Sequence, residues 1–155
     1  MTYNDQMLGI VEQYRAAGES WPASTRQIAA WGVERKILVP HPSSIVKRFA
    51  DDIACAMRED YITDPQGRTV RAKHAARILK DGEQMTLWED IRTAKPQHMQ
   101  IAFQQRRQQI VGDCRQLKTD VDSFNETAKP IKPIQLVLDF TDDVAELEAL
   151  FEAAD

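Results

Sequence analysis

The sequence predicts a mainly α-helical protein with one small β-hairpin, followed by a C-terminal arm built on a long helix. Apolar residues recur at helical spacing in residues 5–17 and 43–59. Asp64-Pro65-Gln66-Gly67 lies between two short β-prone runs, which is the residue chemistry of a hairpin turn. After Pro96, residues 97–125 contain no proline and a single glycine, as expected of a long helix.

Composition excludes several classes of protein. The 155 residues include 43% hydrophobic residues and have a net charge of −4, which is typical of a folded domain rather than a disordered chain. No run approaches the roughly 20 apolar residues of a membrane span, and the N-terminal residues lack a signal-peptide pattern. Cys55 and Cys114 do not form a disulfide framework and are expected to be buried as small apolar residues. We therefore expect a soluble, cytoplasmic protein.

Three helices are expected before the hairpin. The first covers residues 5–17, with Asn4 as its N-cap and Gly18 just after its end. Ser24 and Gln27 form the capping box of a short second helix that meets Gly32. The third helix covers 43–59 and has an apolar face that includes Ile45, Val46, Phe49, Ile53, Ala56 and Met57.

This element order resembles the winged helix-turn-helix family over about residues 5–80. STRQIAAWG resembles its second helix and turn, HPSSIVKRFADDIACAMRED its recognition helix, and YITDPQGRTVRAKHA its wing. The segment ERKILVPHP between the second and third helices is longer than the usual turn. The resemblance implies that the third helix enters the major groove of DNA and that the wing contacts the backbone.

Carried over by position, the resemblance implies a set of polar and basic DNA-binding residues, with Arg48 and Arg71 as the principal candidates. These residues are Arg26, Ser43, Ser44, Lys47, Arg48, Arg68, Arg71 and Lys73. Residues 1–80 carry a net charge of +3 and residues 81–155 one of −7, which also favours the N-terminal part for nucleic acid. The expected function is a small dimeric transcription regulator that binds double-stranded DNA. The alternative is a protein-interaction or scaffold module that has a winged-helix fold and does not bind DNA.

The C-terminal half is expected to be a helical arm over 81–128, followed by 129–155. Thr86-Leu87-Trp88-Glu89 matches a capping box and predicts a short helix, and Pro96 is expected at the first position of the long helix. An apolar stripe at seven-residue spacing packs either on the chain's own first domain or in a coiled-coil-like dimer, and the helix length favours the dimer. The expected dimer interface comprises Met99, Phe103, Ile110, Leu117, Val121 and Phe124.

The last segment follows the linker 129–133. Ile134, Leu136, Leu138 and Phe140 alternate as in a strand or an extended docking segment. Thr141 or Asp142 is expected to cap a final acidic helix, which either covers a groove on the body or binds a partner.

No catalytic signature stands out in the sequence. It contains no Gly-rich phosphate loop, no G-x-S-x-G and no H-E-x-x-H, and its three histidines are far apart. We therefore expect a protein that is not an enzyme and needs no metal or cofactor.

Overall fold

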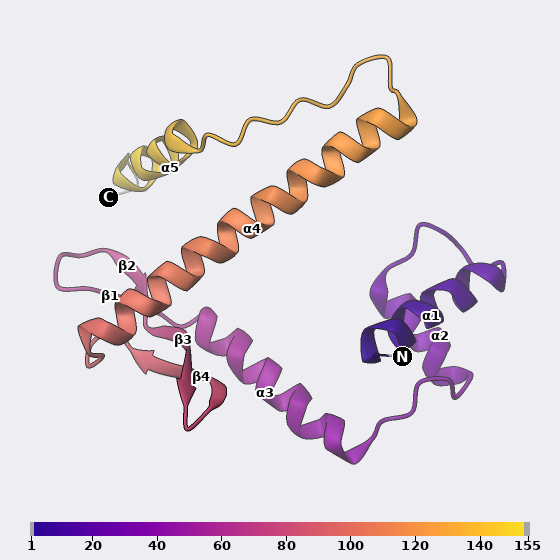
Figure 1. The fold of residues 1–155 in the computed structure, drawn as a ribbon, viewed down its shortest axis with the longest axis horizontal. Coiled ribbons are helices and arrows are strands. Elements are labelled where there is room, and N and C mark those ends of the chain that lie inside the picture. The colour runs from indigo at the N-terminus through magenta and orange to yellow at the C-terminus, as the bar shows by residue number, and fades with distance from the viewer. Residues whose placement is uncertain (1, 154–155) are drawn as a thin grey trace. The chain divides into compact units, whose positions relative to one another are not determined.

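The computed structural model describes residues 2–153, and the chain divides into two compact units, Met1–Ala56 and Met57–Asp155 (Figure 1). The first unit contains helices α1 (Tyr3–Ala16) and α2 (Thr25–Glu34) and most of α3 (Pro42–Arg58). The second contains strands β1 (Tyr61–Thr63), β2 (Thr69–Arg71), β3 (Lys73–Lys80) and β4 (Glu83–Asp90), and helices α4 (Pro96–Ala128) and α5 (Thr141–Ala153). The three helices and the hairpin predicted before residue 80, and the long and terminal helices predicted after it, are therefore present. The boundary expected after residue 80 falls at the tip of a second hairpin.

Helix α1 begins two residues earlier than predicted. Thr2, rather than Asn4, is its N-cap, because Thr2 and Asp5 form a capping box in which each side chain accepts a hydrogen bond from the other residue's backbone N–H. The predicted Ser24–Gln27 capping box of α2 is confirmed. Helix α2 continues through Gly32, whose missing side chain leaves room for Leu38: a Cβ there would lie 2.9 Å from Leu38 Cδ1.

The core of the first unit lies between α1 and α2. Ile10, Tyr14 and Trp31 are buried, and the rings of Tyr14 and Trp31 meet edge to face at 5.6 Å. Their polar atoms are satisfied at the loop that joins the helices, because Trp31 Nε1 donates to Glu19 Oε1 and Tyr14 Oη donates to the Ser20 carbonyl oxygen. These contacts fix how α1 and α2 pack.

Helix α3 has no buried side chain. Its predicted apolar face is exposed, with Val46 at 75%, Phe49 at 61% and Ile53 at 57%. The prediction that Cys55 is buried is therefore wrong, because nothing in the described structure covers this helix, whereas Cys114 is half-buried. A winged-helix core would bury the apolar face of its third helix, so the winged-helix assignment stays a prediction.

The second unit is built on two consecutive hairpins. In the first, β1 pairs antiparallel with β2, and the Asp64 carboxylate accepts hydrogen bonds from the N–H groups of Gln66 and Arg68, as the turn chemistry predicted. The second hairpin, β3–β4, replaces the short helix expected from residue 86. Asp81 and Gly82 both have positive φ, 52° and 79°, which is the geometry of the two-residue Asp-Gly hairpin turn. That turn pairs residue 86 into a strand, so the capping-box interpretation is wrong.

Ala72 joins the two hairpins. It is fully buried, its N–H donates to the Asp60 carbonyl oxygen, and its own carbonyl accepts from the Ile91 N–H, both at 2.8 Å. Because one residue bonds to the chain before β1 and to the chain after β4, the ends of both hairpins are held at the same point.

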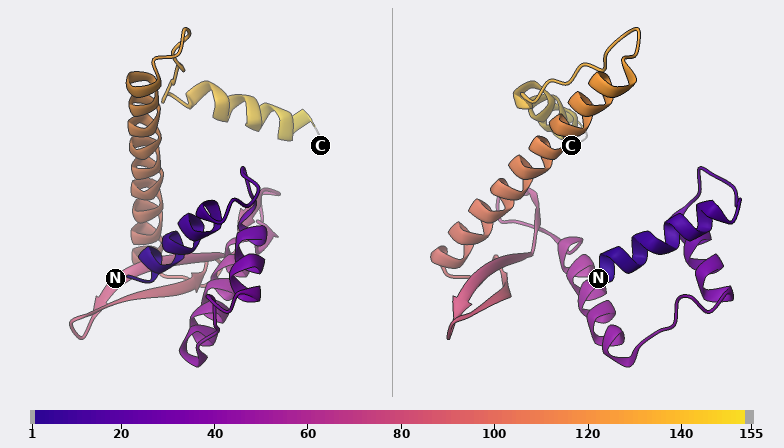
Figure 2. Two further views of the ribbon diagram at one scale, coloured as in Figure 1. Left: turned by 90° about the vertical axis from the view of Figure 1, so that its right-hand side faces the viewer. Right: turned by 45° about the vertical axis from the view of Figure 1, so that its right-hand side comes forward.

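Helix α4 packs against β3 with its N-terminal part, while the rest of the helix extends beyond the hairpin (Figure 2). Ala76 and Ala102 are buried where these elements pack. The Gln105 side-chain amide accepts from the Arg77 N–H at 2.7 Å and donates to the Arg77 carbonyl at 2.8 Å. Gln105 therefore satisfies the unpaired edge of β3, as a neighbouring strand would.

The chain reverses direction after α4, where Lys129 has a φ of 46°. The Asn125 side chain then exchanges two hydrogen bonds with the backbone of Ile134, at 2.9 and 3.0 Å. Residues 131–140 form no strand, so only the extended-segment interpretation agrees with the structure. Thr141 is the first residue of α5 rather than its cap, and the Asp139 carboxylate accepts from its N–H and hydroxyl. Among the described residues, no helix is both long enough and apolar enough to cross a bilayer.

The contact between β3 and α4 predicts the effect of a larger side chain. Ala76→Leu adds three carbons at a fully buried position, and we expect it to lower the free energy of unfolding by about 1–3 kcal/mol. Leu79→Ala, on the same strand but 78% exposed, should change it by no more than about 0.5 kcal/mol. Urea unfolding followed by circular dichroism measures both, and equal small effects would contradict the packing.

Candidate functional site

The second unit contains a hollow of about 520 Å³ between the face of the β3–β4 hairpin, α4 and the last residue of α3. Five basic side chains line it: Arg58, Arg71, Lys73, Arg77 and Arg106. Among the described residues, no aspartate or glutamate lines it, and the remaining polar lining includes Thr86 and three glutamines of α4. We call this region the basic hollow.

The alternation of β3 places Lys73 and Arg77 on one face. His74 and Ala76 are buried, so Lys73, Ala75 and Arg77 belong to the opposite face, and these three residues line the basic hollow together with His74. Across the hairpin, Ala75 pairs with Trp88 and Arg77 with Thr86, which adds these β4 side chains to the same surface. The Arg58 guanidinium lies 5.7 Å from the centre of the Trp88 ring, a cation–π contact that connects the end of α3 to the hairpin.

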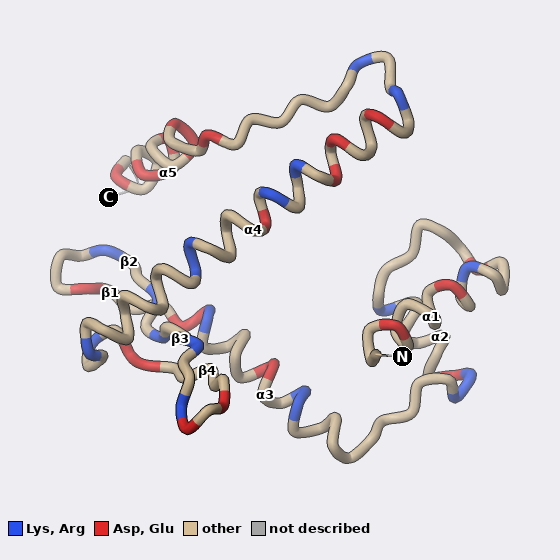
Figure 3. Tube along the Cα trace, in the orientation of Figure 1, with Lys and Arg blue, Asp and Glu red and all other residues tan. Residues whose placement is uncertain are grey.

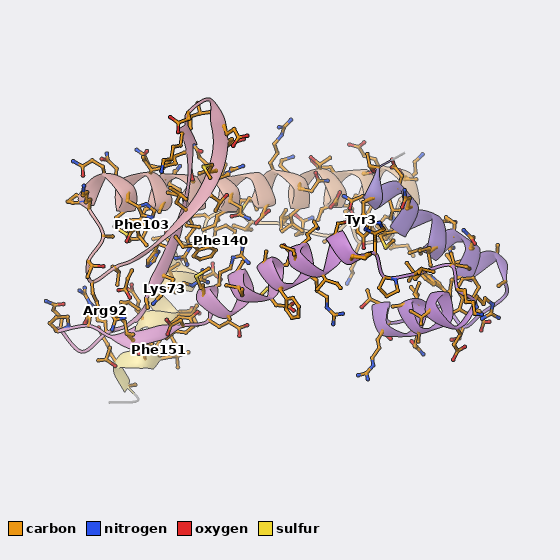
Figure 4. The ribbon with its side chains drawn as sticks, turned by 90° about the horizontal axis from the view of Figure 1, so that it is seen from below. Tyr3, Lys73, Arg92, Phe103, Phe140 and Phe151 are labelled. Carbon is orange, nitrogen blue, oxygen red and sulfur yellow. The ribbon has the colours of Figure 1, made fainter. Side chains whose placement is uncertain are left out.

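Lys73 is neutralised by two carboxylates. Its Nζ lies 3.0 Å from Asp90 Oδ2 and 3.2 Å from Asp60 Oδ2, and these hydrogen bonds raise the pKa of Lys73. Arg92 also pairs with Asp90, and the hydrogen bonds from Arg92, together with the one from Lys73, hold the pKa of Asp90 well below its usual range. Figure 4 labels Lys73 and Arg92 near each other at this end of the hairpin. Lys73 therefore acts as part of a structural ion-pair cluster.

The four arginines of the basic hollow differ from Lys73. Within residues 2–153, none of Arg58, Arg71, Arg77 and Arg106 has a carboxylate within 4.0 Å of its guanidinium nitrogens. Each guanidinium presents planar N–H donors that match carboxylate or phosphate oxygens. Four such groups around one concave surface are suited to the binding of an anion.

His74 has a structural role beside the hollow. Its Nε2 lies 2.8 Å from the Arg71 carbonyl oxygen, and its ring meets the Phe103 ring edge to face at 5.2 Å. His98 Nε2 in turn lies 2.9 Å from the His74 carbonyl oxygen. Phe103, which was expected at a dimer interface, is thus already in contact with the hairpin of its own chain. Among the described residues, no group of three or more His, Cys, Asp or Glu is placed to hold a metal ion.

Only two of the eight DNA-binding residues predicted from the sequence line the basic hollow: Arg71 and Lys73. Arg68 instead forms an ion pair with Asp64 at 2.8 Å in the turn of the first hairpin. The structure brings Arg71 together with Arg58, Arg77 and Arg106, which the sequence did not single out.

The other five predicted residues, Arg26, Ser43, Ser44, Lys47 and Arg48, belong to the first unit. The Ser43 and Ser44 hydroxyls hydrogen-bond to His41 at the start of α3, through its ring Nδ1 and its carbonyl oxygen respectively. Lys47 forms an exposed ion pair with Asp51 at 3.6 Å, as its i,i+4 spacing suggested.

One signal in the sequence points to the residues that were missed. Asp81-Gly82 is a strong hairpin turn signal, and it predicts strands on both sides that include Arg77 and Trp88. Arg106 carries no such signal, because its place depends on how α4 packs.

Comparisons with known protein families, with curated proteins and with solved structures find no match for this chain.

The ion-pair cluster at Asp90 predicts a dependence of stability on pH. Because the folded-state pKa of Asp90 is lowered, its contribution is present above about pH 4, the ordinary pKa of an aspartate, and is lost as the pH falls. Asp90→Asn should lower stability at pH 7 and flatten the loss below about pH 4. Urea unfolding between about pH 7 and pH 2 measures this. Asp113→Asn, an exposed aspartate of α4 without an ion pair in the described structure, should leave the profile unchanged.

Proposed function

We propose that the second unit binds the phosphate backbone of nucleic acid, duplex DNA in the first place, in the basic hollow. The observation that carries this proposal is the convergence of four arginines without carboxylate partners on a concave surface that no acidic residue lines. Arginine binds phosphate oxygens favourably through paired hydrogen bonds.

The neighbouring polar groups support the same ligand. Thr86, Gln108 and Gln109 add neutral side chains that line the hollow, and such groups commonly bond to phosphate and sugar oxygens. The first hairpin, which the sequence suggested as a wing, leads directly into the hollow at Arg71. Backbone contacts of this kind position a protein on DNA without reading its sequence.

Recognition of the DNA base sequence is proposed to come from the first unit. Arg48, next to Lys47 on α3, forms no ion pair within the described residues, so its guanidinium is available for a base edge or a phosphate. Arg26, in the first turn of α2, is an exposed candidate for a phosphate contact. A protein with both kinds of contact fits the role of a small transcription regulator.

The proposal includes a dimer formed through α4. Ile110, Leu117 and Phe124 recur every seven residues and are 46–52% exposed, on a helix of 33 residues whose length is about 50 Å. A second copy of the same helix offers a matching stripe at the same spacing. Val121 adds a half-buried side chain at the edge of this stripe, and Met99 and Phe103 lie nearer the hairpin.

A second candidate function is protein interaction through α3. Its exposed apolar side chains Ile45, Val46, Phe49 and Ile53 share one helix face, and contiguous exposed apolar surface is typical of a binding site for another protein. This function requires neither the basic hollow nor DNA, so the titration below separates the two.

We expect the arginines of the basic hollow to set the salt dependence of DNA binding. Arg106→Ala should weaken binding to every duplex alike and reduce the slope of log K against log salt by about one, because one phosphate contact is lost. Fluorescence anisotropy with a random-sequence duplex at several salt concentrations measures this slope.

Arg107→Ala is the matched control, because Arg107 is an exposed arginine on the same helix and does not line the hollow. It should leave the slope unchanged. The absence of binding at low salt, or unchanged binding in both Arg71→Ala and Arg106→Ala, would contradict the DNA-binding proposal and leave protein interaction through α3.

The dimer has its own test. Glutamates at positions 110 and 117 would place two unpaired charges in the proposed interface, so the double variant Ile110→Glu, Leu117→Glu should sediment as a monomer. Arg115→Glu, about 140° around the helix from Ile110, should leave the dimer intact. Sedimentation velocity at high micromolar protein measures both, and a monomeric wild-type protein would refute the interface.

A further inference from the structure

The C-terminal segment carries charge of only one sign. Residues 134–155 contain seven acidic residues and no basic one. Five of them lie on α5: Asp142, Asp143, Glu146, Glu148 and Glu152. In Figure 3 the charged residues of α5 are red, whereas both blue and red residues occur around the hairpins and along α4. Within the described residues, no α5 carboxylate has an ion-pair partner and no α5 side chain is buried.

Hydrogen bonds direct this segment back along α4. The two bonds between the Asn125 side chain and the backbone of Ile134 fix the reversal after the helix. Cys114 and Val121, within about 40° of Asn125 around the helix, are half-buried, whereas Ile110 and Phe124 are 52% and 50% exposed.

Side-chain exposure also alternates along residues 136–138, in the segment that follows the reversal. Leu136 is half-buried and Leu138 is 38% exposed, whereas Val137 between them is 75% exposed. Ile110, Leu117 and Phe124 are all about half exposed and remain available to a second copy.

The lengths of the two paths allow α5 to reach the level of the basic hollow. From Asn125 back to Arg106 is 19 residues of helix, about 28 Å. From Ile134 to Thr141 is seven residues of extended chain, about 23 Å. Helix α5 therefore begins about 5 Å short of the level of Arg106, and its 13 residues span about 20 Å more.

We propose that the acidic segment 139–153 docks in the basic hollow of its own chain and competes there with nucleic acid. Arginine pairs with a carboxylate through the same planar donors that bind phosphate, so both ligands use Arg71, Arg77 and Arg106. The docking is argued from the complementary charges and from the length of chain between α4 and α5. Only the statement that nucleic acid is the competing ligand rests on the proposed function.

The effect on affinity follows from the tether. A short linker gives an effective concentration of about 1 mM, so a segment that binds with a Kd of about 0.1 mM weakens any competing ligand about tenfold. The competition weakens as salt concentration rises, because both partners are exposed charges.

The first experiment needs no nucleic acid and uses the full-length chain. Its variant neutralises four carboxylates of α5: Asp142→Asn, Asp143→Asn, Glu146→Gln and Glu148→Gln. A fluorescently labelled synthetic peptide with the wild-type sequence of residues 134–155 is titrated at low salt. We expect it to bind the neutralised chain about tenfold more tightly than the wild-type chain, whose own segment occupies the hollow.

Two further variants locate the peptide. Added to the neutralised chain, Arg106→Ala should weaken peptide binding, whereas Arg107→Ala should not. No binding of the peptide to the neutralised chain, or equal binding to the wild-type and neutralised chains, would overturn the docking proposal whatever the outcome with DNA.

The second experiment repeats the duplex titration with the same chains. The neutralised chain should bind DNA about tenfold more tightly than the wild type. A control chain has the same net charge because four exposed carboxylates elsewhere are neutralised: Glu34→Gln, Asp52→Asn, Glu83→Gln and Asp113→Asn. The control chain should gain clearly less DNA affinity than the neutralised chain, and an equal gain would overturn the proposed competition. If the peptide docks but no chain binds DNA, the docking stands and the proposed function fails.

Discussion

The backbone hydrogen bonds of Ala72 are the constraint on which the second unit depends. Because this buried residue bonds to Asp60 on one side and to Ile91 on the other, both hairpins end at one point and β3 leaves it in a fixed direction. The side-chain size also matters, since a residue larger than alanine at a position with no exposed surface would overpack it. The alternation of β3 then places Lys73, Ala75 and Arg77 on one face, where they line the basic hollow.

Packing of α4 on β3 completes the basic hollow. The Gln105 amide holds the helix against the strand edge through the backbone of Arg77, so the same contact that protects the edge also sets the position of Arg106 one residue later. Lys73 forms ion pairs with Asp60 and Asp90, which leaves the arginines as the cations that are available to an anionic ligand. Structural ion pairing and the proposed ligand binding are thereby divided among residues that lie close together in the second unit.

The free arginines and the acidic terminal helix form a pair of complementary charges within one unit. A surface with unpaired cations attracts any accessible polyanion, and the nearest one is covalently attached. The reversal at Asn125 matters for this reason, because the proposed docking requires the chain to return along α4. The proposed nucleic-acid site and its proposed competitor therefore depend on the same arginines.

Local signals in the sequence determined much of the secondary structure. The Ser24–Gln27 capping box, the Asp64–Gly67 turn and Pro96 at the start of α4 act within a few residues, so each could be predicted and each is observed. The same kind of signal was misjudged at Thr86, where the Asp81-Gly82 turn pairs the segment into a strand before a helix can form. Only the tertiary structure decided that the apolar face of α3 is left exposed and that Arg58, Arg77 and Arg106 meet Arg71. These outcomes depend on packing between segments up to about 50 residues apart, which no local pattern encodes.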